Sequence, residues 1–215
     1  MKVFDLYAER YDLWYDLPFG SSVFALEVEC LKRCGPVEGP SLEVGVGSGR
    51  FAKALNVDVG VDTSLELLKI ARSRGLKVLM ARAEELPFKY QSFKSIFMIV
   101  SLCFFEDPLK ALRSARRVIR EDGKLFLGLV LSESPWAKFY MRKAKEGHPL
   151  YSRAKFYSFS EVSNMLKEAG FELKEVFSTL FEEPQDQRPV KNREISKGFH
   201  PEGGFFCMVA EAIKA

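Results

Sequence analysis

One stretch constrains the fold more than any other, residues 41–62 with the sequence SLEVGVGSGRFAKALNVDVGVD. An apolar run at 42–44 is typical of a buried strand, and a turn with glycines at 45, 47 and 49 follows it. A short helical pattern leads to a second apolar strand, 57–61, which ends at Asp62. Glycines allow the backbone to turn sharply and a ligand to approach it closely. The helix that follows offers unpaired N–H groups at its start. The carboxylate of Asp62 can accept hydrogen bonds from the two hydroxyls of a ribose. The stretch predicts a nucleotide-binding unit.

The glycine spacing distinguishes between nucleotide ligands. In the dinucleotide fingerprint G-x-G-x-x-G the third glycine would fall at position 50, which is Arg50. The chain instead has G-x-G-x-G, with Glu43 two residues before the first glycine. This form resembles the first motif of class I S-adenosylmethionine-dependent methyltransferases. A strand, turn and helix that bind no nucleotide remain an alternative. The resemblance implies a cofactor site with Glu43 near the methionine amino group and Asp62 near the ribose hydroxyls, formed by Glu43, Gly45, Gly47, Gly49, Asp62 and Thr63.

Two further stretches resemble parts of the same family. Residues 81–93, ARAEELPFKYQSF, are similar to the segment that brackets the adenine, which implies contacts from Ala83 and Glu84. Arg82 stands at the usual aspartate position, so the contact to the adenine amino group stays open. Residues 8–16, AERYDLWYD, resemble a helix that closes over the cofactor and imply a contact from Tyr11, although core packing is an alternative. The exit of the fourth strand adds Ser101 to the cofactor residues.

Alternating strand and helix patterns predict an α/β fold with a doubly wound, mostly parallel sheet and helices on both faces. The family resemblance implies a Rossmann-like sheet of seven strands with an antiparallel last strand. We expect one domain, 1–215, with an N-terminal helical lid at 1–34 and substrate-side insertions at 132–157 and 181–203. The predicted strands are 42–44, 57–61, 77–81, 95–102, 124–131, 171–180 and 205–212.

Ligands of such sheets lie outside the carboxyl ends of the strands, where the long connection 132–157 begins. Its aromatic residues are candidate walls of an acceptor pocket, and its arginines can pair with an acidic acceptor or the cofactor carboxylate. Sealing of the sheet edge is the alternative role. The predicted acceptor residues are Trp136, Tyr140, Tyr151 and Arg153, with Arg142, Phe156 and Tyr157 as further members. The catalytic residue is left open, with His148, His200 and Glu106 as candidate bases if the acceptor arrives protonated.

Composition narrows the partners. A net charge of +3 is too small to indicate a nucleic-acid binder, and no apolar run has transmembrane length. With no signal-peptide pattern at the N-terminus, we expect a cytoplasmic protein. The four cysteines form no C-x-x-C pair, so we expect reduced core thiols and no metal site.

The predicted function is methyl transfer from S-adenosylmethionine to a small-molecule acceptor. A non-catalytic module that binds the cofactor and an NAD-dependent oxidoreductase are the alternatives. The sequence does not identify the acceptor or the oligomeric state.

Overall fold

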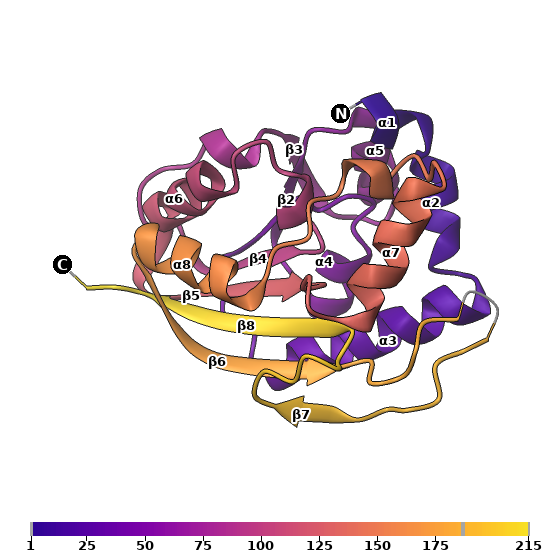
Figure 1. Ribbon diagram of the computed structural model, residues 1–215. Helices are drawn as coiled ribbons and strands as arrows, with labels where there is room; N and C mark the ends of the chain where they lie inside the picture. Colours follow the sequence, from indigo (N-terminus) through magenta and orange to yellow (C-terminus); the bar gives the residue numbers. More distant parts are fainter. Residues whose placement is uncertain (1, 186–187, 215) are drawn as a thin grey trace.

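The structure is a computed structural model that describes residues 2–185 and 188–214. Its strands form one eight-stranded sheet in the order β3-β2-β1-β4-β5-β8-β6-β7 (Figure 1). The strands from β3 to β5 pair in parallel, and β8 is antiparallel to both of its neighbours. The strands are β1 (Ser41–Val44), β2 (Val59–Asp62), β3 (Lys77–Met80), β4 (Phe93–Ile99), β5 (Ile119–Leu129), β6 (Phe171–Thr179), β7 (Ile195–Lys197) and β8 (Phe205–Ala212).

Helices cover both faces of this sheet, as the alternating pattern predicts. Helices α3 and α4 pack on one face, while α6 and α8 pack on the other (Figure 1). The α-helices are α1 (Lys2–Leu6), α2 (Ala8–Trp14), α3 (Pro18–Arg33), α4 (Arg50–Leu55), α5 (Leu65–Ser73), α6 (Pro108–Val118), α7 (Pro135–Lys145) and α8 (Phe159–Glu168). Short 3-10 turns are η1 (Ala83–Glu85), η2 (Leu102–Phe104) and η3 (Tyr151–Arg153).

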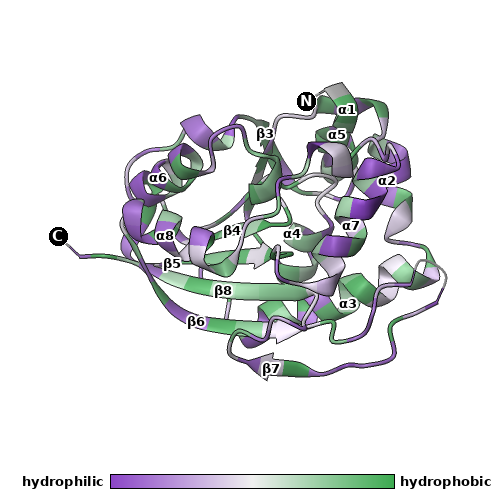
Figure 2. Cartoon of the chain, viewed as in Figure 1, coloured by the Kyte–Doolittle hydropathy of each residue, from purple (hydrophilic) through white to green (hydrophobic). Residues whose placement is uncertain are grey.

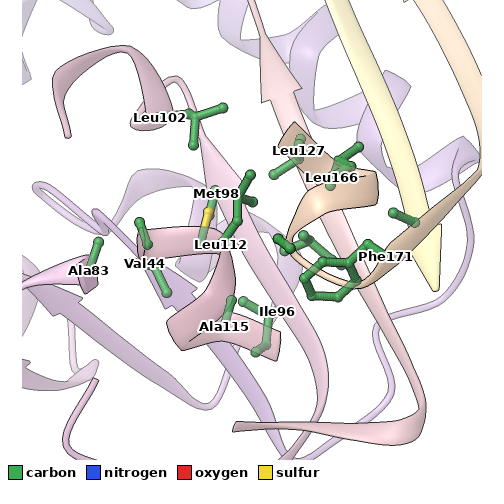
Figure 3. Packing of buried hydrophobic residues seen from close by; sticks show 14 of the residues in the cluster. Val44, Ala83, Ile96, Met98, Leu102, Leu112, Ala115, Leu127, Leu166 and Phe171 are labelled. Atoms are coloured by element: carbon green, nitrogen blue, oxygen red, sulfur yellow. The ribbon is translucent and has the colours of Figure 1, made fainter. Parts of the chain in front are cut away.

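The two faces of β4 supply two separate cores. Ile96 and Met98 join the cluster under α6 and α8, which Figure 3 shows from close by. Phe97 belongs to the cluster under α3 and α4, where it stacks on Phe126 with ring centroids 4.6 Å apart. A strand covered on both faces is apolar at successive positions because the side chains on both of its faces are buried. Figure 2 shows the same continuous hydrophobic character on β8, whereas α2 and α7 carry mostly hydrophilic residues on the side in view.

Several helix ends are where the sequence predicts them. Asp107 caps α6 by accepting from the backbone N–H of Lys110 at 2.9 Å, and Pro108 follows it. The pattern from Ser158 to Glu161 predicts a capping box, and these two residues form it at the start of α8. The similar pattern from Thr63 to Glu66 predicts Thr63 as the cap of α5, but Ser64 accepts from the first turn instead. These side chains satisfy N–H groups that have no partner within the helix.

Two other predictions about helices were wrong in detail. Residues 3–16 carry apolar and aromatic residues at helical spacing, which predicts one helix, but the structure has two, α1 and α2, that meet at Tyr7. The helical pattern after Pro108 predicts a helix that ends at Gly123, but α6 ends at Val118 and Gly123 lies inside β5. An added Cβ at Gly123 would be 2.8 Å from the carbonyl oxygen of Lys94, so this glycine permits a close approach of strands instead of stopping a helix.

The sheet has eight strands rather than seven because β7 pairs antiparallel with β6 at its edge. Its three residues give too short a run for an alternating pattern to be visible in the sequence. The strand lies in the range 181–203, of which residues 186–187 are outside the described residues. No helix in the described part of the chain combines the length and hydropathy needed to cross a bilayer.

Candidate active site

The glycine turn and Asp62 form one hydrogen-bonded unit at the carboxyl end of the sheet. The backbone N–H of Gly47 donates to Asp62 Oδ2 at 2.8 Å, and that of Ser64 donates to Oδ1 at 2.9 Å. The N–H groups of Gly45 and Val46 both donate to the carbonyl oxygen of Val61, at 2.8 and 2.9 Å. The acid that follows β2 therefore has a fixed orientation relative to the turn that follows β1.

Two of the glycines serve different purposes. Gly47 has a φ of +52° and lines a cavity, and a Cβ there would make only ordinary van der Waals contact with Tyr11 Cε1, at 3.8 Å. Gly49 has a φ of +81°, and a Cβ there would be 2.2 Å from Leu76 Cδ1. Gly49 thus allows α4 to pack against the end of α5, whereas Gly47 leaves room for a ligand.

A cavity of about 360 Å³ lies over this unit. Its walls include most of the predicted cofactor residues, namely Tyr11, Gly45, Gly47, Asp62, Thr63, Ala83, Glu84 and Ser101. Arg82, Glu106 and Arg153 also line it. Gly49 and Glu43 do not, so the structure brings together eight of the ten predicted cofactor residues and leaves these two behind the wall.

Glu43 is a buried carboxyl group, with an exposed fraction of 2%. Its Oε2 has no hydrogen-bond partner among the described residues. Burial, with a smaller contribution from the charge of Asp62, raises the pKa of Glu43 well above its usual value. Burial likewise raises the pKa of Asp62, although its hydrogen bonds to backbone N–H groups oppose the shift.

The adenine-side residues form a small ion-pair cluster. Glu84 Oε1 accepts from the backbone N–H groups of Glu106 and Asp107, at 3.1 and 3.3 Å, which joins η1 to the loop before α6. Arg82, at the usual aspartate position, pairs with Glu106 at 2.8 Å and with Glu84 at 3.5 Å. Glu106 is therefore held by a cation, and the hydrogen bond from Arg82 lowers its pKa. A lowered pKa makes Glu106 a poor general base.

Helices α1 and α2 contribute Phe4 and Tyr11 to the wall of the first cavity. Asp5 accepts from the Ser64 hydroxyl at 2.7 Å and from the backbone N–H of Glu66 at 3.2 Å, which attaches α1 to the start of α5. Phe4 packs edge-on against Phe104, with centroids 5.0 Å apart. In Figure 1 both helices lie near the end of the sheet toward which the arrow of β5 points. The N-terminal segment thus adjoins the carboxyl edge of the sheet, as expected of a lid.

A network of ion pairs attaches α2 to the start of α4 and to the end of α5. Asp12 accepts from Arg50 at 2.8 Å and from Arg74 at 2.6 Å, and Arg50 also pairs with Asp16 at 2.7 Å. Burial would raise the pKa of Asp12, but the hydrogen bonds from the two arginines outweigh it and lower this pKa to about 2. Arg50, whose presence argues against the dinucleotide fingerprint, therefore anchors the segment over the cavity.

A second cavity, of about 470 Å³, adjoins the first. The two share Phe4, Tyr11, Val100 and Phe104 in their walls. Aromatic side chains from α2, α7 and the connection after α7 dominate the second cavity. Four residues predicted for the acceptor pocket or its surroundings line it: Tyr140, Tyr151, Phe156 and Tyr157.

Other predicted acceptor residues lie elsewhere. Trp136 has an exposed fraction of 1% and lines neither cavity. Its indole N–H donates to the carbonyl oxygen of Glu182 at 2.8 Å, and its ring stacks on Phe19 with centroids 5.8 Å apart. Arg153 lines the first cavity, not the second, and Arg142 lines neither. Trp136 is thus part of the core behind the pocket wall.

The two candidate histidines differ in position. His148 lines the second cavity, stacks on Tyr151 with centroids 4.2 Å apart, and accepts at Nδ1 from the backbone N–H of Tyr151 at 3.4 Å. His200 lines neither cavity, and its Nε2 is 3.1 Å from the carbonyl oxygen of Lys197 beside β7. In residues 2–185 and 188–214, no group of three or more His, Cys, Asp and Glu side chains could hold a metal ion.

Sequence reasoning missed Phe4, Val100 and Phe104, because a shared wall between two cavities leaves no pattern in the sequence. It also missed Glu27, which lines the second cavity from α3. A signal for Glu27 was present, since the residue falls on the apolar stripe of that helix between Val23 and Leu31.

An open parallel sheet, with a glycine turn and an acid at its carboxyl edge, defines a Rossmann-like nucleotide-binding protein. The sequence model of the family described as "Methyltransferase domain" matches residues 42–127. A solved structure from Thermotoga maritima, described as "SAM-dependent methyltransferase, possible histamine N-methyltransferase", has a TM-score of 0.87 and 32% identity, with 98% of each chain covered. This chain belongs to the S-adenosylmethionine-dependent methyltransferases.

Two sequence relatives are also similar over most of their length. An uncharacterized protein of Methanocaldococcus jannaschii is 42% identical, over 99% of this chain and 100% of its own length. A demethylmenaquinone methyltransferase of Thermotoga maritima is 29% identical, over 84% of this chain and 90% of its own length.

Proposed function

We propose that this chain transfers a methyl group from S-adenosylmethionine to a small-molecule acceptor, with the cofactor in the first cavity and the acceptor in the second. The observation that carries the proposal is the wall of Phe4, Tyr11, Val100 and Phe104 that the two cavities share. Adjoining cavities under one cap can hold a donor and an acceptor in contact while excluding water. Positioning of this kind contributes about 7–11 kcal/mol to rate acceleration.

The first cavity has the groups that this cofactor requires. Asp62 faces it with both carboxylate oxygens fixed by backbone N–H groups, and each oxygen keeps a lone pair for a ribose hydroxyl. The open backbone at Gly47 leaves room beside the turn. When bound, the sulfonium donor supplies the reactive methyl group, and its sulfur takes the electron pair of the broken carbon–sulfur bond. The chain itself needs only to bind, orient and exclude water.

A proton must leave only if the acceptor arrives protonated. His148 is the candidate for that task, because it lines the acceptor cavity and His200 does not. The pair of variants His148→Ala and His200→Ala provides the comparison. We expect the first to lower kcat above about pH 6.5, where an ordinary imidazole is neutral and can accept the proton, and the second to leave kcat unchanged. Equal effects of the two substitutions would remove His148 from the reaction.

Calorimetry with S-adenosylmethionine, S-adenosylhomocysteine and NAD tests the cofactor. We expect the first two to bind and NAD not to bind, and the reverse result would favour an oxidoreductase. A screen with labelled methyl donor then tests transfer to small amines, thiols, phenols and acids. Histamine and demethylmenaquinone, which the names of the relatives mention, enter as probes. Cofactor binding without transfer to any acceptor would favour a non-catalytic binding module.

The proposal includes the remaining expectations from the sequence. Residues 1–34 act as the lid, 132–157 supply the acceptor pocket, and the protein works in the cytoplasm without nucleic acid, membrane or metal. The predicted role of 181–203 as a substrate-side insertion lacks support from the second cavity, since no described residue of this range lines it.

A further inference from the structure

Glu27 stands out among the groups around the second cavity. It belongs to α3, has an exposed fraction of 6%, and is the only acidic side chain among the described residues that line this cavity. No hydrogen bond or ion pair joins its carboxylate to any other described residue. By contrast Glu29, two positions along the same helix, is partly exposed and pairs with Arg33 at 3.4 Å.

An unpaired carboxylate at such a position is costly. The residues around it on the helix, Val23, Leu26, Cys30 and Leu31, have exposed fractions of 0–1%. Burial of a carboxylate without a partner opposes its ionisation, and here it raises the pKa of Glu27 to about 8. An apolar side chain would pack at this position without that cost. Without a partner, Glu27 is mostly the neutral acid near pH 7, and a cationic partner that enters the cavity would favour release of this proton to solvent and pair with the resulting carboxylate.

The walls around Glu27 suit such a partner. Aromatic rings attract cations through the negative potential of their faces. The cavity is lined by Tyr11, Trp14, Tyr15, Phe19, Tyr140 and Tyr151. The basic side chains on its lining come from α2, α7 and the connection after α7: Arg10, Lys143, His148 and Lys155. None of them is paired with Glu27, so the carboxylate has no cation of the described chain as its partner.

We propose that Glu27 binds a protonated nitrogen of the acceptor, so that the second cavity selects molecules with an apolar ring and a basic amine. This inference rests on the proposed function, because it names the acceptor class of the same cavity. A charge-assisted hydrogen bond in a site that excludes water gives both affinity and orientation. Glu27 is then a specificity-determining residue. The proposal does not identify the acceptor atom that receives the methyl group.

The test compares phenethylamine with phenethyl alcohol, which have the same ring and chain but differ in charge. Calorimetric titrations are run with the free protein and with the protein saturated with S-adenosylhomocysteine. We expect the amine to bind at least about tenfold more tightly than the alcohol, the scale of a hydrogen bond to a charged group. Glu27→Gln keeps the shape and removes the charge, and it should abolish this preference.

Two further variants keep the test specific. Glu29→Gln removes an exposed charge from the same helix and should leave the preference unchanged. Glu27→Asp keeps a carboxylate and should retain part of the preference. Thermal melting checks the fold, and Glu27→Gln should be at least as stable as the parent protein because it removes an unpaired buried acid.

Equal binding of amine and alcohol to the parent protein would overturn the proposal. So would a Glu27→Gln variant that keeps the preference, or tighter binding of menadione, a neutral quinone, than of phenethylamine. Failure of S-adenosylhomocysteine to bind would instead refute the proposed function, while the amine preference of the free protein would still be measurable.

Discussion

Asp12 on α2 accepts a hydrogen bond from Arg50 at the start of α4 at 2.8 Å. Arg50 follows directly on the glycine turn, so this ion pair joins the segment over the cofactor cavity to the motif beneath it. Arg74 at the end of α5 donates to the same carboxylate at 2.6 Å and to the carbonyl oxygen of Ser48 at 2.7 Å. The cap is thus attached to two helices whose positions the cofactor site requires.

We expect this attachment to contribute stability in a defined pH range. The pKa of Asp12 is lowered to about 2 in the folded protein, below its value in the unfolded chain. The contribution is therefore complete above about pH 4 and lost as the pH falls toward 2. Asp12→Asn should lower the free energy of unfolding by about 1–2 kcal/mol at pH 6, since solvent screens part of this interaction, and by much less near pH 2. Denaturant unfolding across this range measures the difference.

Asp16→Asn is the matched control. Asp16 also pairs with Arg50, but its side chain has an exposed fraction of 59%. Exposed ion pairs contribute little, so this variant should change the free energy of unfolding by less than about 1 kcal/mol. A pH dependence of Asp12→Asn equal to that of the parent protein would show that Asp12 is not the group responsible.

The cofactor half of the site could be predicted because its determinants are local. The turn at 45–49 and Asp62 are close together in the sequence, and the handedness and order of strands in such units place both at one sheet edge. The contact of Glu43 with the methionine amino group stays a prediction, since the spacing of a motif does not say which way a buried side chain points. Glu43 does not line the cavity, and its Oε2 has no hydrogen-bond partner among the described residues.

The acceptor half depends on packing between distant segments. Trp136 and Tyr140 lie one helical turn apart on α7, yet one is in the core against Phe19 and the other lines the cavity. The contact of Trp136 with Phe19 joins segments far apart in the sequence, so no local pattern encodes it. His200 lies beside β7 because three residues there pair with β6, an edge strand too short to predict.

A second prediction concerns Asp62. Replacement by alanine removes an acceptor for ribose hydroxyls and also releases the N–H groups of Gly47 and Ser64. We expect the affinity for S-adenosylmethionine to fall by about 1–3 kcal/mol, the scale of hydrogen bonds to a charged group. Calorimetry measures this, and melting without ligand shows how much of the effect is a loosened turn. An unchanged affinity would exclude Asp62 from the site.

Activity should not depend on a metal ion. The cofactor already carries the activated methyl group, so the reaction needs no Lewis acid. Exhaustive chelation followed by an assay of methyl transfer should leave the rate unchanged. Loss of activity that magnesium or zinc restores would contradict this expectation.

The last prediction separates the pocket wall from the core behind it. Tyr151 lines the acceptor cavity and is half-buried, whereas Trp136 is fully buried and lines neither cavity. Tyr151→Ala should impair methyl transfer about tenfold or more through lost positioning, with little change in the binding of S-adenosylhomocysteine. Trp136→Ala should instead lower the free energy of unfolding by about 3–5 kcal/mol, the cost of a large cavity in a core. Its activity should persist at temperatures where the variant stays folded.

If Trp136→Ala loses methyl transfer while fully folded, the indole acts on the acceptor after all. If Tyr151→Ala keeps full activity, the acceptor lies elsewhere.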